Sequence, residues 1–413
     1  MKNVVSLAWF RDAASGYESP RAGTSQGIFF YNFIRIIVRA HFAVWKDWTL
    51  RIHHDERVKG YDCWPWLERL AECGMIELVP MGESKGLCKS MTWRLAPLFD
   101  PTVDYFICRD VDSLPMHRDR VMVEQFLASG AAVHMLLDSE SHSGYMGGMT
   151  GYHAPSVREA LRVKSLEELW ALDPANDLMI HGSDQRLLNN VLTARLMDRT
   201  FVHQRRNDIC YPRAMKTLPV APQATTLDQV VRHVGAAFPR ELADKVLREN
   251  HGYEDVAGHD RLTMLDTLKM PRAEPWYVEG AIRFLEGVIK PEWRVLEFGG
   301  GASSVWYKKR VGRVATVEHD PFWRLMIREN AKDVELFGAW DFNRSDSFDL
   351  VCIDGINRVE TTKKAMQMVL PGGYLLLDNA EEGSMAAIHE MLLGWEKHSF
   401  GDDKWTTCLW RRA

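Results

Sequence analysis

The chain has no apolar run of the roughly 20 residues that a membrane-spanning helix needs. Arg11 and Asp12 interrupt the first apolar stretch before it reaches the length of a signal-peptide core. Internal repeats and low-complexity tracts are also missing. These absences predict a soluble, cytoplasmic protein without a transmembrane segment.

The sequence also lacks an excess of basic residues and any closely spaced pair of cysteines. Lys and Arg total 51 against 56 Asp and Glu, a net charge of −5, so the composition gives no reason to expect a nucleic-acid partner. The seven cysteines are dispersed, and no CxxC pattern indicates a zinc site or a thioredoxin-type pair. We expect reduced thiols, mostly in hydrophobic cores.

Short apolar runs alternate with helical patterns in both halves of the 413-residue chain, which is long enough for two domains. In the first half the pattern predicts strands near 4–10, 50–56, 75–81 and 105–110, and helices over 27–42 and 64–74. In the second half it predicts a helix over 276–289 and strands within 294–301, 313–320, 348–355 and 372–381. Such alternation is typical of an α/β fold with a mainly parallel sheet.

The stretch between these halves has a different composition. It runs from Pro212 to about Pro275, opens with PRAMKTLPVAPQATT and continues with helical patterns but no strand-like run. We interpret 214–274 as a linker and a mostly helical connector. The predicted domains are therefore 1–213 and 275–413.

The clearest local signal is RVLEFGGGASS, in which a predicted strand runs into Gly299, Gly300 and Gly301. Glycines at such a position allow a tight turn and a close approach of the backbone to a ligand. The next predicted strand ends in Glu318, about 20 residues on, where an acid can bind the two hydroxyls of a ribose. The alternative is a tight strand-to-helix turn with a solvated Glu318. A dinucleotide fingerprint fits less well, because Ser304 stands in place of its third glycine.

Residues of about 276–410 resemble class I S-adenosylmethionine-dependent methyltransferases in VLEFGGGASS, VEHD, FDLVCIDG and LPGGYLLLDN. The resemblance implies a Rossmann-like sheet that binds S-adenosylmethionine. It implies that Glu297, Gly299 and Gly301 surround the methionine part of this cofactor, that Glu318 holds its ribose, and that Asp354 belongs to the same site.

Asp354, Asp378 and Asn379 also stand where metal-dependent O-methyltransferases of the catechol and caffeoyl type carry an Asp and an Asp-Asn pair. Three oxygen ligands suit Mg²⁺, which would hold a pair of neighbouring sugar hydroxyls. Two alternatives stay open. The two acids could simply end their strands near the cofactor. Alternatively, the chain could be similar to methyltransferases that carry DGxxR and GGxxxxDN patterns and are not assigned a metal; Arg358 fits the first of these patterns.

In the first half, the stretch YFICRDVDSL places Asp110 and Asp112 at the end of a predicted buried strand. Two neighbouring carboxylates repel each other unless a cation lies between them. At the carboxyl end of an α/β sheet, where ligands bind, such a pair can hold Mg²⁺ or Mn²⁺ together with phosphate oxygens. The alternative is two solvated acids in a loop, because a lone DxD pattern is common.

Three downstream patterns accompany this pair. SHSGYMGGMTGYH contains Gly147 and Gly148, which would let a loop pass close to a sugar or phosphate. IHGSDQRLLN predicts a helix capped by Ser183 or Asp184. TFVHQ places His203 at the end of a short apolar run.

Together with MTWRLAPLFDPTVDYFICRDVDS, these patterns resemble the GT-A class of nucleotide-sugar glycosyltransferases over about 1–213. The resemblance implies that Asp110 and Asp112 bind a divalent metal and the donor diphosphate, with His203 as a further metal ligand. It implies these other roles: donor binding by Arg94, Arg109, Gly147 and Gly148, and catalytic positions near the sugar for Asp184 and Asp138. The alternatives are a core or exposed histidine for His203 and a helix N-cap for Asp184.

The chain is therefore predicted to be a bifunctional glycan-modifying enzyme. Its first domain would transfer a sugar from a nucleotide-sugar in an Mn²⁺- or Mg²⁺-dependent reaction, and its second would methylate a hydroxyl of a glycan or related acceptor. Tethering the two sites would raise the effective concentration for successive steps. Two alternatives remain: one half is a non-catalytic nucleotide- or glycan-binding module, or the whole chain is a non-catalytic scaffold.

Overall fold

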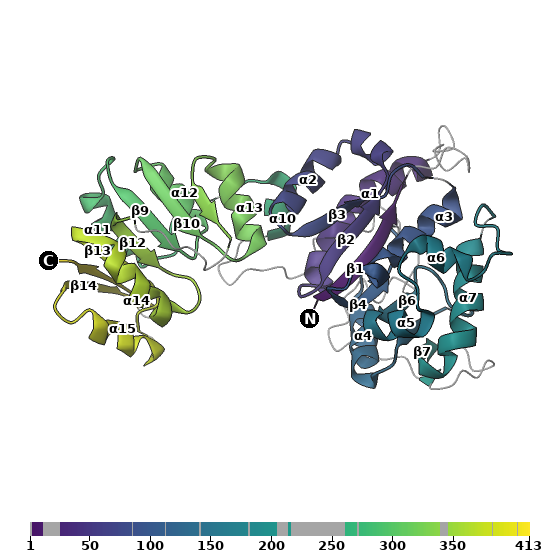
Figure 1. The fold of residues 1–413 in the computed structure, drawn as a ribbon. Coiled ribbons are helices and arrows are strands. Elements are labelled where there is room, and N and C mark those ends of the chain that lie inside the picture. The colour runs from purple at the N-terminus through teal and green to yellow at the C-terminus, as the bar shows by residue number, and fades with distance from the viewer. Residues whose placement is uncertain are drawn as a thin grey trace. The chain divides into compact units, whose positions relative to one another are not determined.

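The computed structural model divides the chain into two compact units, Met1–Gly258 and His259–Ala413, here called the N-terminal and C-terminal units (Figure 1). It describes residues 2–10, 25–84, 86–111, 113–139, 142–180, 182–204, 214–215, 261–270, 272–338, 346–381, 383–402 and 404–413. Each unit is built around one mixed sheet, which confirms the predicted α/β class. The predicted connector lies mostly outside the described residues, apart from β8 (Ala214–Met215) and α10 (Arg261–Thr267).

The N-terminal unit contains an eight-stranded sheet of order β3-β2-β1-β4-β6-β5-β7-β8. Its other strands are β1 (Lys2–Trp9), β2 (Thr49–His54), β3 (Ile76–Pro80), β4 (Val103–Cys108), β5 (Val133–Leu137), β6 (Thr150–His153) and β7 (Thr200–Gln204). Only β6 runs antiparallel to its neighbours among these described strands. The four strands predicted in the first half correspond to β1 through β4.

Helices cover this sheet, as Figure 1 shows. They are α1 (Ser25–Val44), α2 (Trp64–Glu72), α3 (Leu87–Met91), α4 (His117–Ser129), α5 (Ala154–Leu161), α6 (Leu166–Ala171) and α7 (Ser183–Leu196), with 3-10 helices η1 (Glu56–Gly60), η2 (Thr92–Phe99) and η3 (Met197–Arg199). Because both faces are covered, strands such as β5 are buried at every residue and read as continuous apolar runs.

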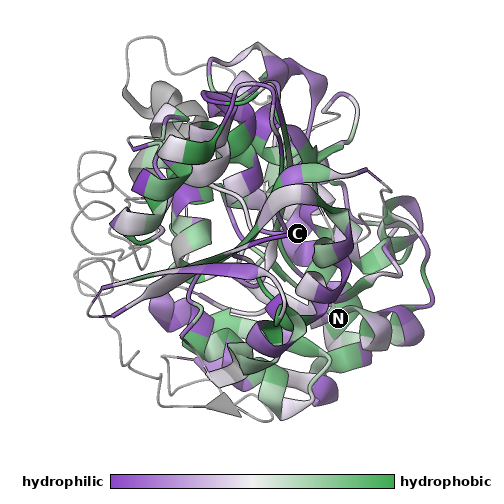
Figure 2. Ribbon diagram, turned by 90° about the vertical axis from the view of Figure 1, so that its left-hand side faces the viewer, coloured by the Kyte–Doolittle hydropathy of each residue, from purple (hydrophilic) through white to green (hydrophobic). Residues whose placement is uncertain are grey.

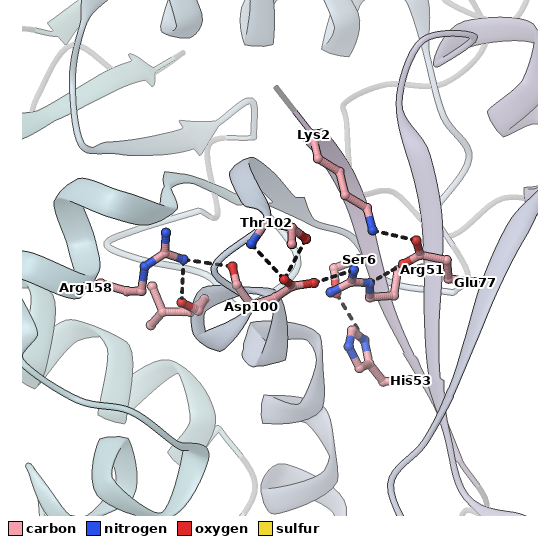
Figure 3. A network of polar contacts seen from close by, with 9 residues as sticks. Lys2, Ser6, Arg51, His53, Glu77, Asp100, Thr102 and Arg158 are labelled. Atoms are coloured by element: carbon pink, nitrogen blue, oxygen red, sulfur yellow. Dashed lines mark hydrogen bonds and ion pairs between the residues drawn. The ribbon is translucent and has the colours of Figure 1, made fainter. Parts of the chain in front are cut away.

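A polar network joins the amino ends of three strands of this unit (Figure 3). The buried Arg51 donates from Nε to Glu77 at 2.5 Å and from Nη2 to Asp100 at 2.8 Å. Lys2 adds a second cation to Glu77 at 2.6 Å, and the backbone N–H of Thr102 donates to Asp100 at 2.9 Å. This network therefore fixes the strands at the edge opposite the carboxyl ends, where a ligand site is expected.

The C-terminal unit contains a seven-stranded sheet of order β11-β10-β9-β12-β13-β15-β14, in which β15 is antiparallel to β13 and β14. The strands are β9 (Arg294–Phe298), β10 (Arg313–Val317), β11 (Glu335–Phe337), β12 (Phe348–Ile353), β13 (Val369–Leu377), β14 (Glu396–Gly401) and β15 (Thr406–Arg411). Besides α10, the helices are α11 (Glu279–Val288), α12 (Ala302–Lys308), α13 (Pro321–Asn330), α14 (Arg358–Met368), α15 (Ala386–Met391) and the 3-10 helix η4 (Gly383–Met385).

Figure 2 shows that the helices carry both hydrophobic and hydrophilic residues, as expected of helices that face a sheet on one side and water on the other. In the C-terminal unit the buried apolar residues form one cluster on each face of the sheet, around Leu296 and Leu375 on one face and Val295 and Leu376 on the other. In the portion of the chain that the structure describes, every helix is too short or too polar to cross a bilayer.

Both sheets have a point at which the strand order reverses. In the N-terminal unit, β2 lies on one side of β1 and β4 on the other; in the C-terminal unit, β10 and β12 flank β9 in the same way. In open α/β sheets, ligands bind outside the carboxyl ends of the strands at this reversal. The loops that follow β1, β4, β9 and β12 are therefore where the candidate sites should lie.

Candidate functional sites

The glycine-rich loop of the C-terminal unit packs backbone to backbone against the loop after β12. Gly299 has φ +86°, and a Cβ added there would lie 2.6 Å from Cα of Gly355 and 2.8 Å from the carbonyl carbon of Asp354. The amide N–H groups of Asp354 and Gly355 both donate to the carbonyl oxygen of Phe298 at 2.8 Å. Only glycine therefore satisfies both the left-handed backbone and this close contact.

We expect Gly299→Ala to destabilise the C-terminal unit by about 2–4 kcal/mol, because a Cβ is strained at this φ and forces the two loops apart. Urea unfolding followed through the reactivity of the buried Cys352 thiol would measure the change. Gly287→Ala is the matched control, since a Cβ at that helical position meets no atom within 4 Å. A Gly299→Ala protein as stable as wild type would contradict the loop packing described here.

Glu318, the acid predicted to hold a ribose, is tied to the glycine-rich loop. Its Oε2 accepts the backbone N–H of Gly300 at 2.8 Å, and its Oε1 accepts that of Asp320 at 2.6 Å. Burial raises the pKa of Glu318, and the two backbone N–H groups oppose this rise. The loops after β9 and β10 thus carry one acid and three glycines in a single corner of the sheet.

Glu297 lies under this loop and is completely buried. One carboxylate oxygen, Oε2, accepts the Ser304 hydroxyl and, at 3.3 Å, the Thr316 hydroxyl. The other, Oε1, is buried without a hydrogen-bond partner among the described residues. Burial raises the pKa of Glu297 to about 8.

Arg358 hydrogen-bonds all three residues that were predicted as metal ligands. Its Nη2 donates to Oδ1 of Asp354 at 3.3 Å and to Oδ1 of Asn379 at 3.0 Å, while Nη1 donates to the carbonyl oxygen of Asp378 at 2.7 Å. Oδ1 of Asp378 accepts the Thr407 hydroxyl at 2.6 Å. A guanidinium thus supplies the positive charge at this position, which favours the alternative without a metal and disfavours Asp354, Asp378 and Asn379 as a metal site.

A cavity of about 470 Å³ opens beside this arginine, lined by Gly355, Asn357, Arg358, Val359, Glu360 and Met385. Asn357 and Asn379 both adopt the left-handed conformation, with φ of 54° and 46°. Non-glycine residues in this region are uncommon, although Asn tolerates it best. Burial and the neighbouring Asp378 raise the pKa of Asp354, which follows β12 and directly precedes Gly355 of the cavity wall.

In the N-terminal unit, Arg94 is the cation that Asp110 faces. Arg94, from η2, is buried and donates from Nη1 to Oδ1 of Asp110 and from Nη2 to Oδ2 of Asp184 at 3.0 Å. Burial alone would lower the pKa of Arg94, but the two carboxylates outweigh burial and raise it. Asp184 belongs to the first turn of α7, whose N-cap is Gly182 without a side-chain cap, so the predicted cap at Ser183 or Asp184 is wrong.

Gly147 and Gly148 cover this ion cluster. A Cβ on Gly147 would overlap the Arg94 guanidinium and lie 3.0 Å from Oδ2 of Asp184, and a Cβ on Gly148 would overlap the Asp110 carboxylate. The sequence therefore places glycines where the loop crosses the charged groups. The structure brings together five predicted residues: Arg94, Asp110, Gly147, Gly148 and Asp184.

A cavity of about 160 Å³ lies against this cluster. Its polar lining includes Arg94, Asp110, Asp184 and Gln185, and its apolar lining includes Leu87, Cys88, Met91, Met146 and Met149. The sequence analysis did not predict these apolar residues. Neither α3 nor the segment with Met146 and Met149 carries a pattern that distinguishes a cavity wall from the hydrophobic core. The cavity combines charged hydrogen-bonding groups with a flexible apolar wall.

Two other predicted residues, Arg109 and Asp138, do not join this cluster. Arg109 makes a bidentate pair with Asp119 of α4, at 2.8 and 2.6 Å, so its predicted donor-binding role is not supported. Asp138 is buried and accepts Nη2 of Arg118 at 2.6 Å, an ion pair that the prediction of a catalytic acid did not anticipate. Neither residue lines the cavity beside Asp110.

His203 is a core histidine rather than a metal ligand. Its Nδ1 hydrogen-bonds Nε2 of His134 at 2.8 Å, and its Nε2 hydrogen-bonds Oε1 of Gln125 at 2.8 Å. Both ring nitrogens are therefore occupied, and burial lowers the pKa of His203 to about 4. Asp112, the second acid of the DxD pattern, lies outside the described residues, and no metal-binding group of three His, Cys, Asp or Glu residues occurs within the described part of the chain.

Comparison with known proteins gives a limited set of similarities. No protein-family model matches the chain, and no curated protein matches it. Among solved structures, a methyltransferase from Pyrococcus furiosus is 17% identical with a TM-score of 0.26, covering 32% of this chain and 82% of that one. A precorrin-6y C5,15-methyltransferase from Geobacter metallireducens is 16% identical with a TM-score of 0.29, covering 32% and 87%. The tRNA (m1A58) methyltransferase from Aquifex aeolicus is 16% identical with a TM-score of 0.28, covering 41% and 85%. At TM-scores this low, a functional assignment depends on the geometry of the two sites.

Proposed function

We propose that the C-terminal unit binds S-adenosylmethionine and transfers its methyl group to a hydroxyl of a glycan or related acceptor. The observation that carries this proposal is the corner formed by the Gly299–Gly301 loop and Glu318 at the reversal of the strand order. The fold does not require a glycine at Gly301, because a Cβ there would have an ordinary contact of 3.4 Å with Trp323. A ligand lying against this backbone accounts for the glycine instead.

The chain offers a group for each part of the cofactor. Glu318 keeps lone pairs on both carboxylate oxygens for the ribose hydroxyls, and the buried carboxyl group of Glu297, on the strand that leads into the glycine-rich loop, would attract the ligand's ammonium group. The bound cofactor would supply an activated methyl group. Asp354, whose pKa is raised, would accept the proton that the acceptor hydroxyl loses, and the cavity beside Arg358 would hold the acceptor.

Titration calorimetry with S-adenosylmethionine tests this proposal. We expect wild type to bind and Glu318→Ala to bind about 10- to 100-fold more weakly, because hydrogen bonds to a charged group contribute about 1.5–3 kcal/mol. Glu396→Ala, at an exposed position of β14, is the control and should leave affinity unchanged. Equal affinity of Glu318→Ala and wild type would contradict the predicted ribose contact.

For the N-terminal unit we propose sugar transfer from a nucleotide-sugar, because the cluster of Arg94, Asp110 and Asp184 lines a cavity at the reversal of the strand order. Arg94 would hold the two acids in place, and Asp110 and Asp184 would accept hydrogen bonds from sugar hydroxyls. This proposal does not require the predicted metal, since Asp110 already has an arginine partner and both ring nitrogens of His203 form hydrogen bonds.

Titration of UDP and GDP, each with and without Mn²⁺, would identify the nucleotide and any metal requirement. Asp112→Ala should abolish metal-dependent binding, and Asp198→Asn, at an exposed position of η3, should not. Absence of nucleotide binding by wild type would instead favour the reading of this unit as a glycan-binding module.

A further inference from the structure

Glu297 is an acid without a positive partner. Its side chain is completely buried, and it forms no ion pair with any Lys, Arg or His that the structure describes. An isolated carboxylate in an apolar interior is so costly that the group takes up a proton instead. The free protein therefore holds Glu297 as a neutral carboxylic acid.

The groups that face Glu297 come from every element packed against it, and none of them is cationic. The helix α12 contributes Ser303, Ser304 and Tyr307, and β10 contributes Thr316. From β12 come Cys352, paired with Glu297 across the strands, and the acid Asp354.

Tyr277, which precedes α11, completes this environment. Its hydroxyl lies 3.3 Å from that of Tyr307, which in turn lies 3.2 Å from the Cys352 thiol. Burial raises the pKa of Tyr277, Tyr307 and Cys352 alike, so these groups stay neutral at physiological pH.

S-adenosylmethionine carries two positive charges, on its ammonium and sulfonium groups, and one negative charge, on its carboxylate. Oε1 of Glu297 is buried without a hydrogen-bond partner among the described residues, on the strand that leads into the loop where the methionine part is proposed to bind. A positive charge nearby favours the ionised form of a carboxylic acid. We propose that binding of S-adenosylmethionine releases to solvent the proton that Glu297 holds in the free protein, so that the ligand's charge takes the place of that proton.

This inference rests on the proposed cofactor and adds a proton to its binding equilibrium. Burial raises the pKa of Glu297 to about 8, which means that the acid is largely protonated at pH 7. Affinity should then rise with pH between 6 and 7.5, by up to about tenfold per pH unit, and level off above the pKa of the free protein.

Calorimetry at pH 7.0 in phosphate, HEPES and Tris tests the coupling, because the apparent enthalpy varies with the buffer's ionisation enthalpy in proportion to the protons released. We expect about one proton released per S-adenosylmethionine bound to wild type. Glu297→Gln has the same shape and no proton to lose, so its release should fall to near zero. Asp354→Asn is the control for the neighbouring acid whose pKa is also raised, and it should keep the release.

The outcomes distinguish failure of the proposed cofactor binding from failure of the proposed proton release. Absence of S-adenosylmethionine binding would overturn the proposed cofactor and, with it, the coupling. Binding to wild type with no proton released, or with an affinity independent of pH from 6 to 8, would overturn the coupling alone. Loss of the release in Asp354→Asn, but not in Glu297→Gln, would assign the proton to Asp354 and overturn the role of Glu297. If Glu297→Gln does not fold, the pH dependence of affinity in Asp354→Asn decides the question, because that variant keeps Glu297 and lacks the neighbouring acid whose pKa is also raised.

Discussion

Lowering the pH from 7 to 5 is expected to destabilise the N-terminal unit by at least about 6 kcal/mol and to stabilise the C-terminal unit by about 2 kcal/mol. The N-terminal unit buries neutral histidines, whereas the C-terminal unit buries neutral acids. Burial lowers the pKa of His41 to about 4, of His53 to about 3 and of His203 to about 4. These opposite shifts give the two halves of one chain opposite responses to acid.

The direction follows from which state binds more protons. An unfolded histidine with a pKa of 6.5 takes up a proton below that pH, while its buried counterpart stays neutral, so stability is lost as pH falls from 6.5 toward the folded pKa. Each of the three histidines contributes a loss of about 2 kcal/mol at pH 5. The combined loss from the three histidines is comparable to the whole free energy of unfolding of a typical domain, about 5–15 kcal/mol.

The C-terminal unit responds with the opposite sign because its buried acid is protonated when folded. The pKa of Glu297 is raised from 4.5 to about 8, so the folded state binds more protons at pH 7 and gains stability as pH falls toward 4.5. The gain between pH 7 and 5 is about 2 kcal/mol for this group alone.

Urea unfolding at pH 7 and pH 5, read by a short thiol-labelling pulse at one common pH, would follow each unit through its own buried cysteines. The N-terminal unit reports through Cys63, Cys73, Cys88 and Cys108, and the C-terminal unit through Cys352 and Cys408. The free energy of unfolding is expected to fall by about 2–3 kcal/mol for each molar increase in urea. The midpoint of the N-terminal unit should therefore fall by about 2 M, and that of the C-terminal unit should rise by about 1 M. Midpoints that move in the same direction would contradict the prediction.

His53→Gln provides an internal control. His53 hydrogen-bonds Ser6 and the Leu7 carbonyl oxygen, each at 3.2 Å, so the variant should be less stable at pH 7. The variant also lacks one titrating group. The stability that the N-terminal unit loses between pH 7 and 5 should therefore be smaller by about 2 kcal/mol. An unchanged loss would mean that other groups cause the acid sensitivity.

The features that the sequence predicted correctly are local ones. The alternation of apolar runs and helical patterns located β1 to β4 and β9, β10, β12 and β13, because burial on both faces of a parallel sheet leaves continuous apolar runs. The Gly299–Gly301 turn could be placed at the end of β9 for the same reason, since a strand and the turn that ends it are adjacent in sequence.

Side-chain partners could not be predicted in the same way. Arg109 and Asp110 are neighbours at the end of β4, where successive side chains point to opposite faces, so one pairs with Asp119 and the other with Arg94. The sequence did not show which of the two arginines faces the acid. Asp184 is 90 residues from Arg94, and only the fold brings them to 3.0 Å.

The prediction for His203 failed for a related reason. The apolar run in TFVHQ forms β7, but a histidine at the end of a buried strand is equally compatible with ligation and with a core hydrogen bond. Its partner His134 lies on the neighbouring strand β5, a contact that depends on strand order. Arg358 in the C-terminal unit likewise favours the alternative without a metal, through contacts with two loops that the sequence alone could not bring together.

Replacing Arg94 by Met is expected to destabilise the N-terminal unit by about 3–5 kcal/mol, because removal of one partner leaves Asp110 and Asp184 facing each other without a cation. Arg94 is only 3% exposed, so water cannot take over its role without a rearrangement of η2. Unfolding in urea, followed through the buried Cys88 and Cys108 thiols, would measure the loss.

The triple variant Arg94→Met, Asp110→Asn, Asp184→Asn separates the loss of charge balance from the loss of packing. If unpaired carboxylates cause the destabilisation, the triple variant should recover most of the stability that the single variant loses, since it buries no uncompensated charge. A triple variant no more stable than Arg94→Met would mean that the packing of the arginine, and not its charge, holds this region together.

Adding Mn²⁺ to the Arg94→Met protein addresses why Asp110 stands at the end of β4. A divalent cation that binds between Asp110 and Asp184 should stabilise the variant, because a ligand that binds only the folded state shifts unfolding by mass action. Wild type, in which the guanidinium already lies between the two carboxylates, should gain less from the same Mn²⁺ concentration. Stabilisation of the variant alone would mean that arginine and metal compete for one position, whereas equal stabilisation of both proteins would mean that any metal binds elsewhere and that Asp110 does not depend on it.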